Sequence, residues 1–327
     1  MKKSVIFFIL AVVVAFSVIT GCKKLSSPAA PAATNVPTPI ASYTDFVSVP
    51  IGTFTQTDGT NSFSHIISAF KMGKYQVTYD LWYKVYLWAI ANGYTFQNAG
   101  AEGSNGTAGA TPGTMSQPVT TINWRDAIVW CNAYSQKTGL TPVYCSDAGF
   151  NTAIKSSANG SYGSSINTTA GSFDNPHVNW NTNGYRLPTE GEYQYASSYN
   201  DGTAWTPYNY ASGATAAYIY EAATDLVGWD TVNSGGGGGT NAVGSLAANA
   251  LGIYDMSGNV WEWCWDWYGT YPTTASADYT GPASGSSRVL RGGSYDFGAY
   301  SLELGYRGYD YPYITDINYG FRFARTN

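Results

Sequence analysis

The clearest hydrophobic pattern in the chain has helical spacing. In the segment KYQVTYDLWYKVYLWAIANG, apolar side chains recur on one face between Leu81 and Ala89. Thr78 precedes this face as a candidate N-cap, and Gly93 follows it at a position suited to a helix end. The pattern predicts a helix between these two residues.

Two further segments carry local helix-start signals. In NWRDAIVWCNAYSQKTG, Asn123 and Asp126 form a variant of the capping box, and Gly139 closes a stretch with one apolar face. In RLPTEGEYQYASS, Thr189 and Glu192 form a second capping box. We therefore expect a second long helix and a short third one.

The remaining pattern is that of short strands and loops. FVSVPIGTF at 46–54 alternates like a strand, and the aromatic-rich segments 251–269 and 288–295 look like strands with tight turns. Residues 200–250 are rich in Gly, Ala, Asn and Thr and predict a long loop region. A few helices with many short strands predict an α+β domain with much irregular backbone.

The first residues have the pattern of a secretion signal. Lys2 and Lys3 precede an apolar run over 5–19, which is too short and wrongly flanked for a transmembrane helix. The run ends in ITGC, which resembles a bacterial lipobox, and this resemblance implies a signal peptide over 1–21 and a lipid on Cys22. We therefore expect an exported protein anchored to a membrane by lipid and displayed on the outer surface.

Composition narrows the class of partner. Residues 22–45 are rich in Lys, Ser, Ala and Pro and predict a flexible tether, which leaves 46–327 as one domain. Only 11% of residues are charged, the net charge is −5, and aromatic residues reach 16%. A typical globular chain has about 25% charged residues. This balance suits an extracellular protein and excludes nucleic acid as a partner, because that partner needs a basic patch.

The cysteines do not form a metal-binding pattern. If Cys22 is lipidated, Cys131, Cys145 and Cys264 remain, so at least one is unpaired in a monomer. A disulfide between Cys131 and Cys145 is one pairing that the sequence allows.

Five motifs occur in the order of a known family. QPVTTINWRDAIVWC, YRLPTEGEYQYAS, GNVWEWCWDWY, RVLRGGS and the closing GFR resemble the formylglycine-generating-enzyme (sulfatase-modifying factor) domain over almost all of the predicted domain. The resemblance implies a variant of the C-type lectin fold, with two main helices, short strands and much irregular loop.

The same resemblance bears on catalysis. Enzymes of this family need two cysteines shortly after RGGS, which bind copper. Here those positions fall at Phe297 and near Leu302, and no Cys follows Cys264. A thiolate is the nucleophile and the soft-metal ligand of that chemistry. We therefore expect no copper and no enzyme activity, and an oxidase of this family is the less favoured alternative.

The resemblance also implies one structural calcium ion. Its ligands carry over to Asp255, Gly258, Val260 and Glu262, as two carboxylates with two backbone carbonyls, a set of oxygen ligands that suits calcium. The alternative is that both carboxylates hydrogen-bond to the backbone in a tight turn. A calcium-dependent carbohydrate-binding module is the corresponding alternative function.

The RGGS…GFR frame is shared by a second group with this fold. These are the variable proteins of diversity-generating retroelements, in which template adenines are randomised, and together with the lipobox the chain is similar to the variable lipoproteins of Treponema. The resemblance implies a variable region over about 295–319, with Ala299, Arg307 and Pro312 as fixed residues. The positions implied to vary and to bind ligand are Asp296, Phe297, Gly298, Tyr300, Ser301, Tyr306, Gly308, Tyr309, Asp310, Tyr311, Tyr313, Ile314, Ile317 and Tyr319.

The residue types at these positions agree with adenine randomisation. Changing the two adenines of AAC or AAT codons gives Asp, Tyr, Ser, Gly, Ile and Phe, but never Lys, Glu, Gln, Met or Trp, and none of those five occurs at a candidate position. Tyr with Ser, Gly and Asn is also the composition of antibody binding loops. We therefore expect a non-catalytic, receptor-like protein that binds a protein or glycan on another cell or host.

A ligand-binding role for the candidate positions predicts where their side chains lie. The candidate side chains should face solvent, on backbone held by buried anchors such as Trp261, Trp263, Arg291 and Phe321. The alternative is that the tyrosines pack on one another inside a loop-rich core. That alternative requires burial of most of Tyr300, Tyr306, Tyr309, Tyr311 and Tyr313.

Overall fold

The computed structural model describes residues 45–158 and 165–327, all of which belong to one packed unit of the chain. The predicted signal peptide, Cys22 and the tether lie outside the described residues. Within the described part, no helix combines the length and the apolar character needed to cross a bilayer.

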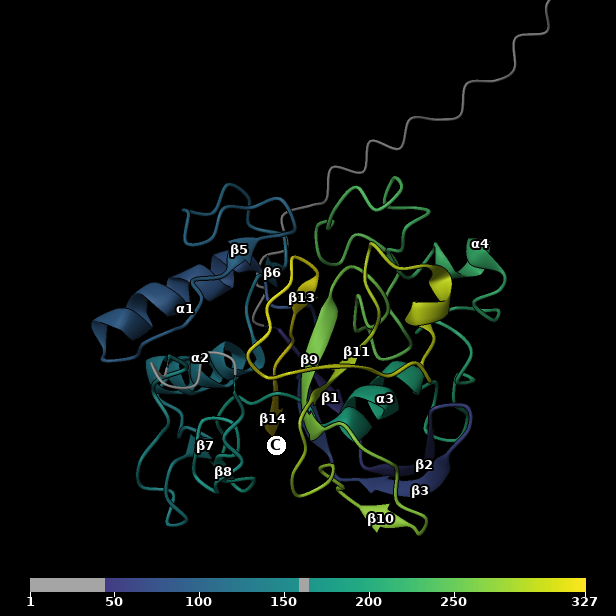
Figure 1. Cartoon of the computed structure of the whole chain (residues 1–327). Helices are drawn as coiled ribbons and strands as arrows, with labels where there is room; N and C mark the ends of the chain where they lie inside the picture. The colour runs from purple at the N-terminus through teal and green to yellow at the C-terminus, as the bar shows by residue number, and fades with distance from the viewer. Residues whose placement is uncertain (1–44, 159–164) are drawn as a thin grey trace, which may run out of the picture. The chain divides into compact units, whose positions relative to one another are not determined.

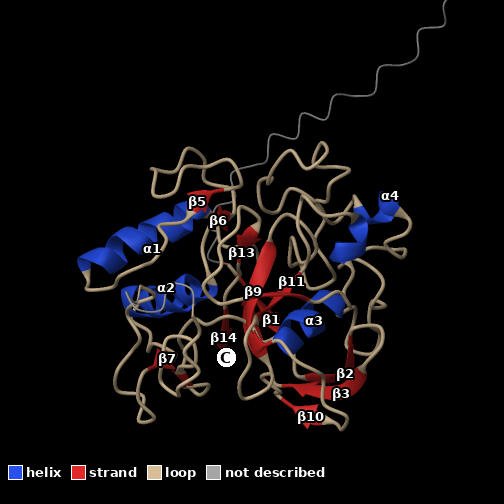
Figure 2. Ribbon diagram, viewed as in Figure 1, coloured by secondary structure: helices blue, strands red, loops and turns tan. Residues whose placement is uncertain are grey.

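Short strands form small sheets rather than one large one (Figures 1 and 2). β4 pairs with β1 on one side and with the distant β14 on the other, so both ends of the described chain meet in one antiparallel sheet. A four-stranded sheet has the order β12-β11-β9-β13, and β10 adds to the β2–β3 hairpin. The strands are β1 (Phe46–Val49), β2 (Gly52–Thr57), β3 (Ser62–Ile67), β4 (Phe70–Gly73), β5 (Ala101–Glu102), β6 (Val119–Thr120), β7 (Tyr144–Cys145), β8 (His177–Val178), β9 (Trp261–Trp267), β10 (Ser276–Ala277), β11 (Arg288–Arg291), β12 (Gly308–Asp310), β13 (Tyr319–Gly320) and β14 (Ala324–Thr326).

The strand predictions are largely confirmed, with one correction. The segments 251–269 and 288–295 contain β9 and β11, as expected. The single strand predicted over 46–54 is wrong, because the chain there forms β1 and the start of β2. Pro50 follows β1 and has no backbone N–H to donate to a ladder, which explains the interruption.

The three predicted helices are confirmed with their caps. The side chains of Thr78, Asn123 and Thr189 accept N–H groups of the first turn, and the second and third helices have complete capping boxes. Gly93 and Gly139 follow their helices with φ of 81° and 76°, a conformation that favours glycine. The described helices are α1 (Tyr79–Ala91), α2 (Trp124–Lys137), α3 (Glu190–Ser198), the single turn α4 (Glu221–Thr224) and the 3₁₀ turn η1 (Ala299–Leu302).

The four-stranded sheet β12-β11-β9-β13 lies between two hydrophobic clusters. Trp263 of β9 and Leu290 of β11 belong to the cluster around α1 and α2, which lie side by side in Figure 1. Cys264 and Val289, the next residue along β9 and the preceding one on β11, belong to the cluster around α3. Successive side chains of a strand point to opposite faces, so this alternation lets β9 and β11 support both halves of the core.

The described cysteines are unpaired. Cys131, Cys145 and Cys264 are buried and free, so the Cys131–Cys145 disulfide that the sequence allowed is not formed. Cys131 lies on α2 within the core cluster, and burial raises the pKa of its thiol well above the usual range. A buried, protonated thiol acts as a small hydrophobic side chain.

Candidate functional site

The predicted variable positions form the surface of the segment that follows β11. In Figure 1 this C-terminal segment crosses β9 and β11. Five of the fourteen residues are exposed, namely Asp296, Tyr300, Tyr309, Tyr311 and Ile317. Eight are half-buried, namely Phe297, Gly298, Tyr306, Gly308, Asp310, Tyr313, Ile314 and Tyr319.

The tyrosines lie on the surface and not in the core. Tyr300, Tyr309 and Tyr311 are 46%, 56% and 44% exposed, and Tyr306 and Tyr313 are half-buried. None of the five is buried, which excludes the alternative in which most of them pack inside the core.

The exposed rings are ordered by stacking on one another. Tyr311 and Tyr313 stack with 5.4 Å between ring centroids, and Tyr309 lies 4.2 Å from Tyr268. Such pairs hold the rings in place. The guanidinium groups of Arg125 and Arg307 lie over Tyr313 and Tyr268, so Tyr311 and Tyr309 are the more exposed member of each pair. Tyr268 lies outside the predicted variable segment. It extends the tyrosine surface beyond the residues between RGGS and GFR, and the sequence analysis did not predict this.

Ser301 is the one exception. It is fully buried in η1, where its Oγ donates to the carbonyl of Gly298 at 3.0 Å. The prediction that all candidate side chains point to solvent is therefore wrong for Ser301. A 3₁₀ turn places successive side chains on different sides, so Tyr300 faces out while Ala299 and Ser301 face in.

Arg307, implied to be fixed, holds the tyrosine surface from below. Its guanidinium donates to both carboxylate oxygens of Glu190, at 2.6 and 2.8 Å, and to the carbonyl of Gly269 at 2.8 Å. It also lies 4.5 and 4.2 Å from the ring centroids of Tyr268 and Tyr271. Burial disfavours its charge, but Glu190 more than offsets this and raises the pKa of Arg307 above its ordinary value.

The predicted anchors are confirmed as buried residues. Trp261, Trp263, Arg291 and Phe321 are between 0% and 4% exposed. Arg291 donates to the carbonyls of Tyr306 and Leu304, so it fixes the backbone beneath the variable side chains.

A second loop supports the same surface. The backbone N–H of Thr231 donates to the carbonyl of Phe297 at 3.0 Å, and the Oγ of Ser234 donates to the carbonyl of Tyr295 at 2.9 Å. Val232 between them is 55% exposed. The sequence predicted a loop here but not its contact with the variable segment. Both contacts are accepted by backbone carbonyls, which every residue type has, so no sequence pattern indicates them.

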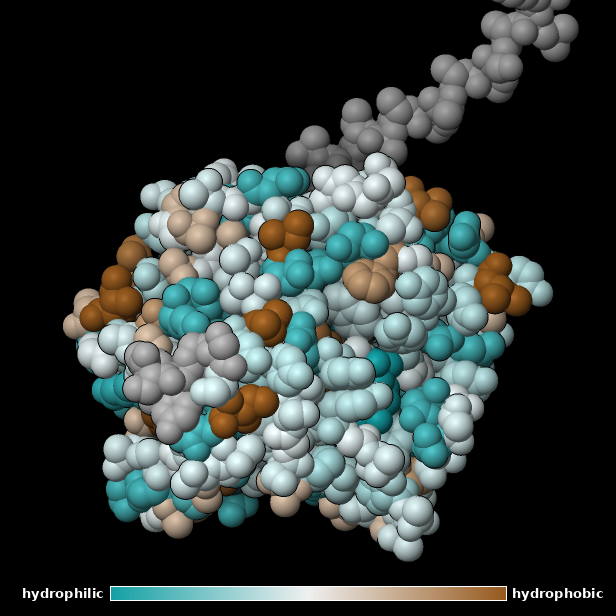
Figure 3. All heavy atoms as spheres, in the orientation of Figure 1, coloured by the Kyte–Doolittle hydropathy of each residue, from teal (hydrophilic) through white to brown (hydrophobic). Residues whose placement is uncertain are grey.

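The surface carries few charges, and those in the variable segment are mostly acidic. Arg307 is the single cation between 296 and 319, and it is paired with Glu190. Asp310 accepts the hydroxyl of Tyr319 at 3.0 Å, and Asp296 is the only exposed charge among the candidate positions. Figure 3 shows a largely polar face in this orientation, with most hydrophobic residues lying singly. The patch therefore presents mainly tyrosine surface and hydrogen-bonding groups, the composition of antibody binding loops.

The four residues of the predicted calcium site converge on one atom. The carbonyl oxygens of Asp255, Gly258 and Val260 each lie 3.2 Å from Nε2 of Gln76, and Oε1 of Glu262 lies 3.1 Å from it. The site differs from the expectation at Asp255, which presents its carbonyl and not its carboxylate. That carboxylate accepts the N–H of Gly244 at 2.7 Å, and burial raises its pKa to about 6.

The donor atoms are of the kind that a hard cation prefers, but Gln76 and Arg322 already bind to them. Three carbonyls and one carboxylate oxygen are ligands that calcium prefers. An amide nitrogen has two hydrogens, which can serve two of the four oxygens. Arg322 donates to the other two, the carbonyl of Asp255 at 3.0 Å and Oε1 of Glu262 at 2.7 Å, so all four can be paired without a cation. In the described residues, no three His, Cys, Asp or Glu side chains gather as a metal site, so carbonyls supply most of this set. Calcium at this point requires both the amide of Gln76 and the guanidinium of Arg322 to move away.

Calcium is expected to raise the thermal midpoint of unfolding relative to a chelator. A ligand at 100 times its dissociation constant stabilises a folded protein by about 2.7 kcal/mol. Differential scanning fluorimetry in calcium chloride and in EDTA measures the shift. The substitution Glu262→Gln should remove the response, whereas Glu221→Gln, on an exposed residue of α4, should keep it. Equal midpoints of the unsubstituted protein in both buffers would contradict the calcium site.

Comparison with known proteins agrees with this architecture. The model of the sulfatase-modifying factor enzyme 1-like domain matches residues 31–327. The chain is similar to the structure of Treponema denticola variable protein 1, with 29% identity, a TM-score of 0.67, and coverage of 86% of this chain and 95% of that one. The predicted resemblance to a Treponema variable protein is thus confirmed.

Two sequence relatives complete the comparison. The chaperone protein LppX of Paenibacillus barcinonensis is 29% identical over 280 residues, which cover 81% of this chain and 83% of that protein. The formylglycine-generating enzyme of Streptomyces coelicolor is 34% identical over 162 residues, but the match spans 45% of this chain and 51% of that enzyme. Because the domain model matches all of the described residues, the chain belongs to the family of sulfatase-modifying factor enzyme 1-like domains, with its C-type lectin-like α+β fold.

Proposed function

We propose that the chain is a ligand-binding, receptor-like protein, held at the outer surface of a membrane by a lipid on Cys22. Its variable positions recognise a protein or a glycan on another cell or a host. The observation that carries the proposal is the division of the C-terminal segment into exposed candidate side chains and buried frame residues. A recognition surface that must accept many side chains needs this division, because substitutions at exposed positions change stability by only about 0.5 kcal/mol.

Diversification by a retroelement is part of the proposal. Thirteen of the fourteen residues whose types fit adenine randomisation are exposed or half-buried. The residues implied to be fixed, Ala299 and Pro312, are buried, and Arg307 is paired below the surface. The similarity to a variable protein of Treponema denticola supports the same reading.

The proposal treats the protein as non-catalytic. At the positions of the family's two copper-binding cysteines, Phe297 packs edge-on against Trp261 with 5.8 Å between centroids, and Leu302 is fully buried. Neither side chain supplies a thiolate. The alternative oxidase predicts copper binding and turnover of a cysteine-containing peptide, so either result with the pure protein would overturn this part of the proposal.

The first test is on DNA. The 3′ end of the gene and its flanks are sequenced from several isolates. We expect a nearby near-copy that differs only at adenines, and isolates that differ only at the candidate positions. If isolates keep Tyr300, Tyr306, Tyr309 and Tyr311 unchanged and no near-copy exists, the diversified-receptor proposal fails. Glycan-array binding that a chelator abolishes would then favour the calcium-dependent carbohydrate-binding module.

A further inference from the structure

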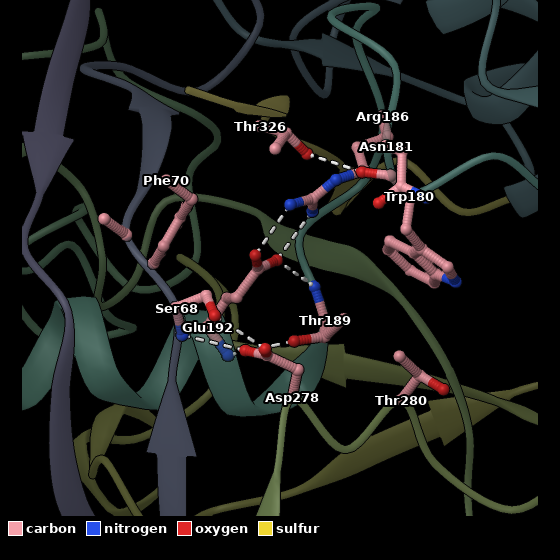
Figure 4. Close-up of a pocket in the computed structure, with 11 residues that line it drawn as sticks. Ser68, Phe70, Trp180, Asn181, Arg186, Thr189, Glu192, Asp278, Thr280 and Thr326 are labelled. Carbon is pink, nitrogen blue, oxygen red and sulfur yellow. Dashed lines mark hydrogen bonds and ion pairs between the residues drawn. The ribbon is translucent and has the colours of Figure 1, made fainter.

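A cavity of about 450 Å³ lies apart from the variable positions, none of which lines it (Figure 4). Its volume falls within the range of about 300–1,000 Å³ typical of small-molecule sites. It is formed where the turn between β3 and β4, the chain leading into α3, the segment after β10, and β14 come together. The lining residues are Ser68, Ala69, Phe70, Trp180, Asn181, Arg186, Thr189, Glu192, Asp278, Thr280 and Thr326.

The charges at the base of the cavity cancel. Arg186 and Glu192, 4% and 8% exposed, form a two-point ion pair with distances of 2.6 and 2.7 Å. Glu192 also accepts the backbone N–H of Thr189 at 2.9 Å. Both carboxylate oxygens are thus occupied, and the guanidinium is not available as a free cation for an anionic ligand.

One side of the cavity is aromatic. Trp180 is half-buried, and the guanidinium of Arg186 lies 5.2 Å from its ring centroid. The hydroxyl of Thr326 donates to the carbonyl of Trp180 at 3.0 Å and so fixes the backbone that carries the indole. Figure 4 shows this indole to one side of the cavity, with Asp278 and Ser68 to the other.

The other side is polar and held in place. Ser68 donates to Asp278 through its N–H at 2.8 Å and its hydroxyl at 2.7 Å. Each oxygen of the exposed Asp278 carboxylate accepts one of these bonds and retains capacity for another. Asn181 and Thr280 add an amide and a hydroxyl to the lining.

We propose that this cavity binds a neutral polyhydroxylated molecule, such as a monosaccharide or the terminal sugar of a glycan. Trp180 packs against the apolar face of the sugar ring, while Asp278, Asn181 and Thr280 bond its hydroxyls. Arg186 and Glu192 neutralise each other, so Asp278 is the remaining charged group of the lining and its negative charge disfavours an anionic ligand. A fully apolar ligand is disfavoured too, because it would leave the polar groups of the lining without hydrogen-bond partners. The site is built from residues outside the variable region, so its test is separate from that of the variable patch.

The test uses the full-length chain with a panel of neutral methyl glycosides. Saturation-transfer difference NMR finds the binder, and calorimetry measures its affinity. We expect Trp180→Ala to weaken binding by about tenfold or more, since the stacked face is lost, and Trp180→Phe to retain most of it. Asp278→Asn keeps the backbone, whose φ of 43° suits Asn. It removes the charge and exchanges one acceptor oxygen for an NH2 group, which the Ser68 hydroxyl can accept from by rotating, so it should weaken a neutral sugar severalfold at most. Circular dichroism confirms that each variant is folded.

Further arms of the experiment separate this site from other ones. Tyr309→Ala, in the variable patch, and addition of EDTA should leave glycoside binding unchanged. The proposal is overturned if no glycoside binds at millimolar concentration, or if Tyr309→Ala or EDTA abolishes binding. It is also overturned if choline or inorganic phosphate binds this cavity in place of a glycoside, because that result would assign it to a charged ligand.

Discussion

The substitution Glu262→Gln is expected to lower the free energy of unfolding by about 3–5 kcal/mol, because it leaves the charge of Arg322 buried without its partner. Both side chains are fully buried, and the guanidinium contacts both carboxylate oxygens at 2.6 and 2.7 Å. Arg322 also donates to the carbonyls of Tyr254 and Asp255, so the loss would loosen the turn that leads into β9. Urea denaturation followed by tryptophan fluorescence measures the change.

A matched control and a double variant separate charge from packing. Glu221→Gln makes the same chemical change on an exposed residue and should alter stability by no more than about 0.5 kcal/mol. The pair Glu262→Leu with Arg322→Met removes both charges and should recover part of the loss, since no buried ion is left unpaired. A loss below about 1 kcal/mol for Glu262→Gln would show that the ion pair does not stabilise the core.

The second large effect is expected at Arg307, where Arg307→Gln should cost about 2–3 kcal/mol. It removes two charge-assisted bonds to the buried Glu190 and the ring contacts with Tyr268 and Tyr271. Glu190 keeps the hydroxyl of Tyr271 at 3.1 Å and Arg291 at 3.7 Å, which limits the loss. By contrast, Tyr309→Ser or Tyr311→Ser should cost about 1 kcal/mol or less, because each removes one exposed ring from a stacked pair.

The difference in stability loss between Arg307→Gln and the tyrosine substitutions tests whether fixed and variable residues have been assigned correctly. The same assignment is tested by a library of variants in which the exposed candidate positions carry residues that adenine randomisation can produce, and Arg307 is unchanged. The thermal midpoints of unfolding of these variants should lie within a narrow range. Ser301 is the informative exception, because it is fully buried and a larger side chain there would be forced into the packed protein beneath η1. If Tyr309→Ser destabilises as strongly as Arg307→Gln, the exposed tyrosines are structural and the frame has been assigned incorrectly.

Local signals in the sequence were sufficient for α1, α2 and α3, but not for the single turn α4, which lies in the segment predicted as a loop, or for η1. Thr78, the Asn123–Asp126 pair and the Thr189–Glu192 pair each act within one turn, so their pattern predicts where a helix begins without knowledge of the fold. Strand partners were not predictable in the same way. The pairing of β4 with β14 joins Met72 to Ala324, about 250 positions apart in the chain, and no local pattern encodes that contact.

For the candidate site, too, some features could be predicted from local sequence and others depend on long-range contacts. The ordered motifs and the residue types between RGGS and GFR were enough to indicate the family, the positions implied to vary and the anchors beneath them. The convergence of four oxygens on Gln76, the support of Phe297 by Thr231 and the burial of Ser301 depend on segments far apart in the sequence. So does the cavity beside Trp180, whose walls come from four such segments. Composition and spacing record which side chains are available, whereas enclosure and charge pairing arise only when tertiary packing brings distant segments together.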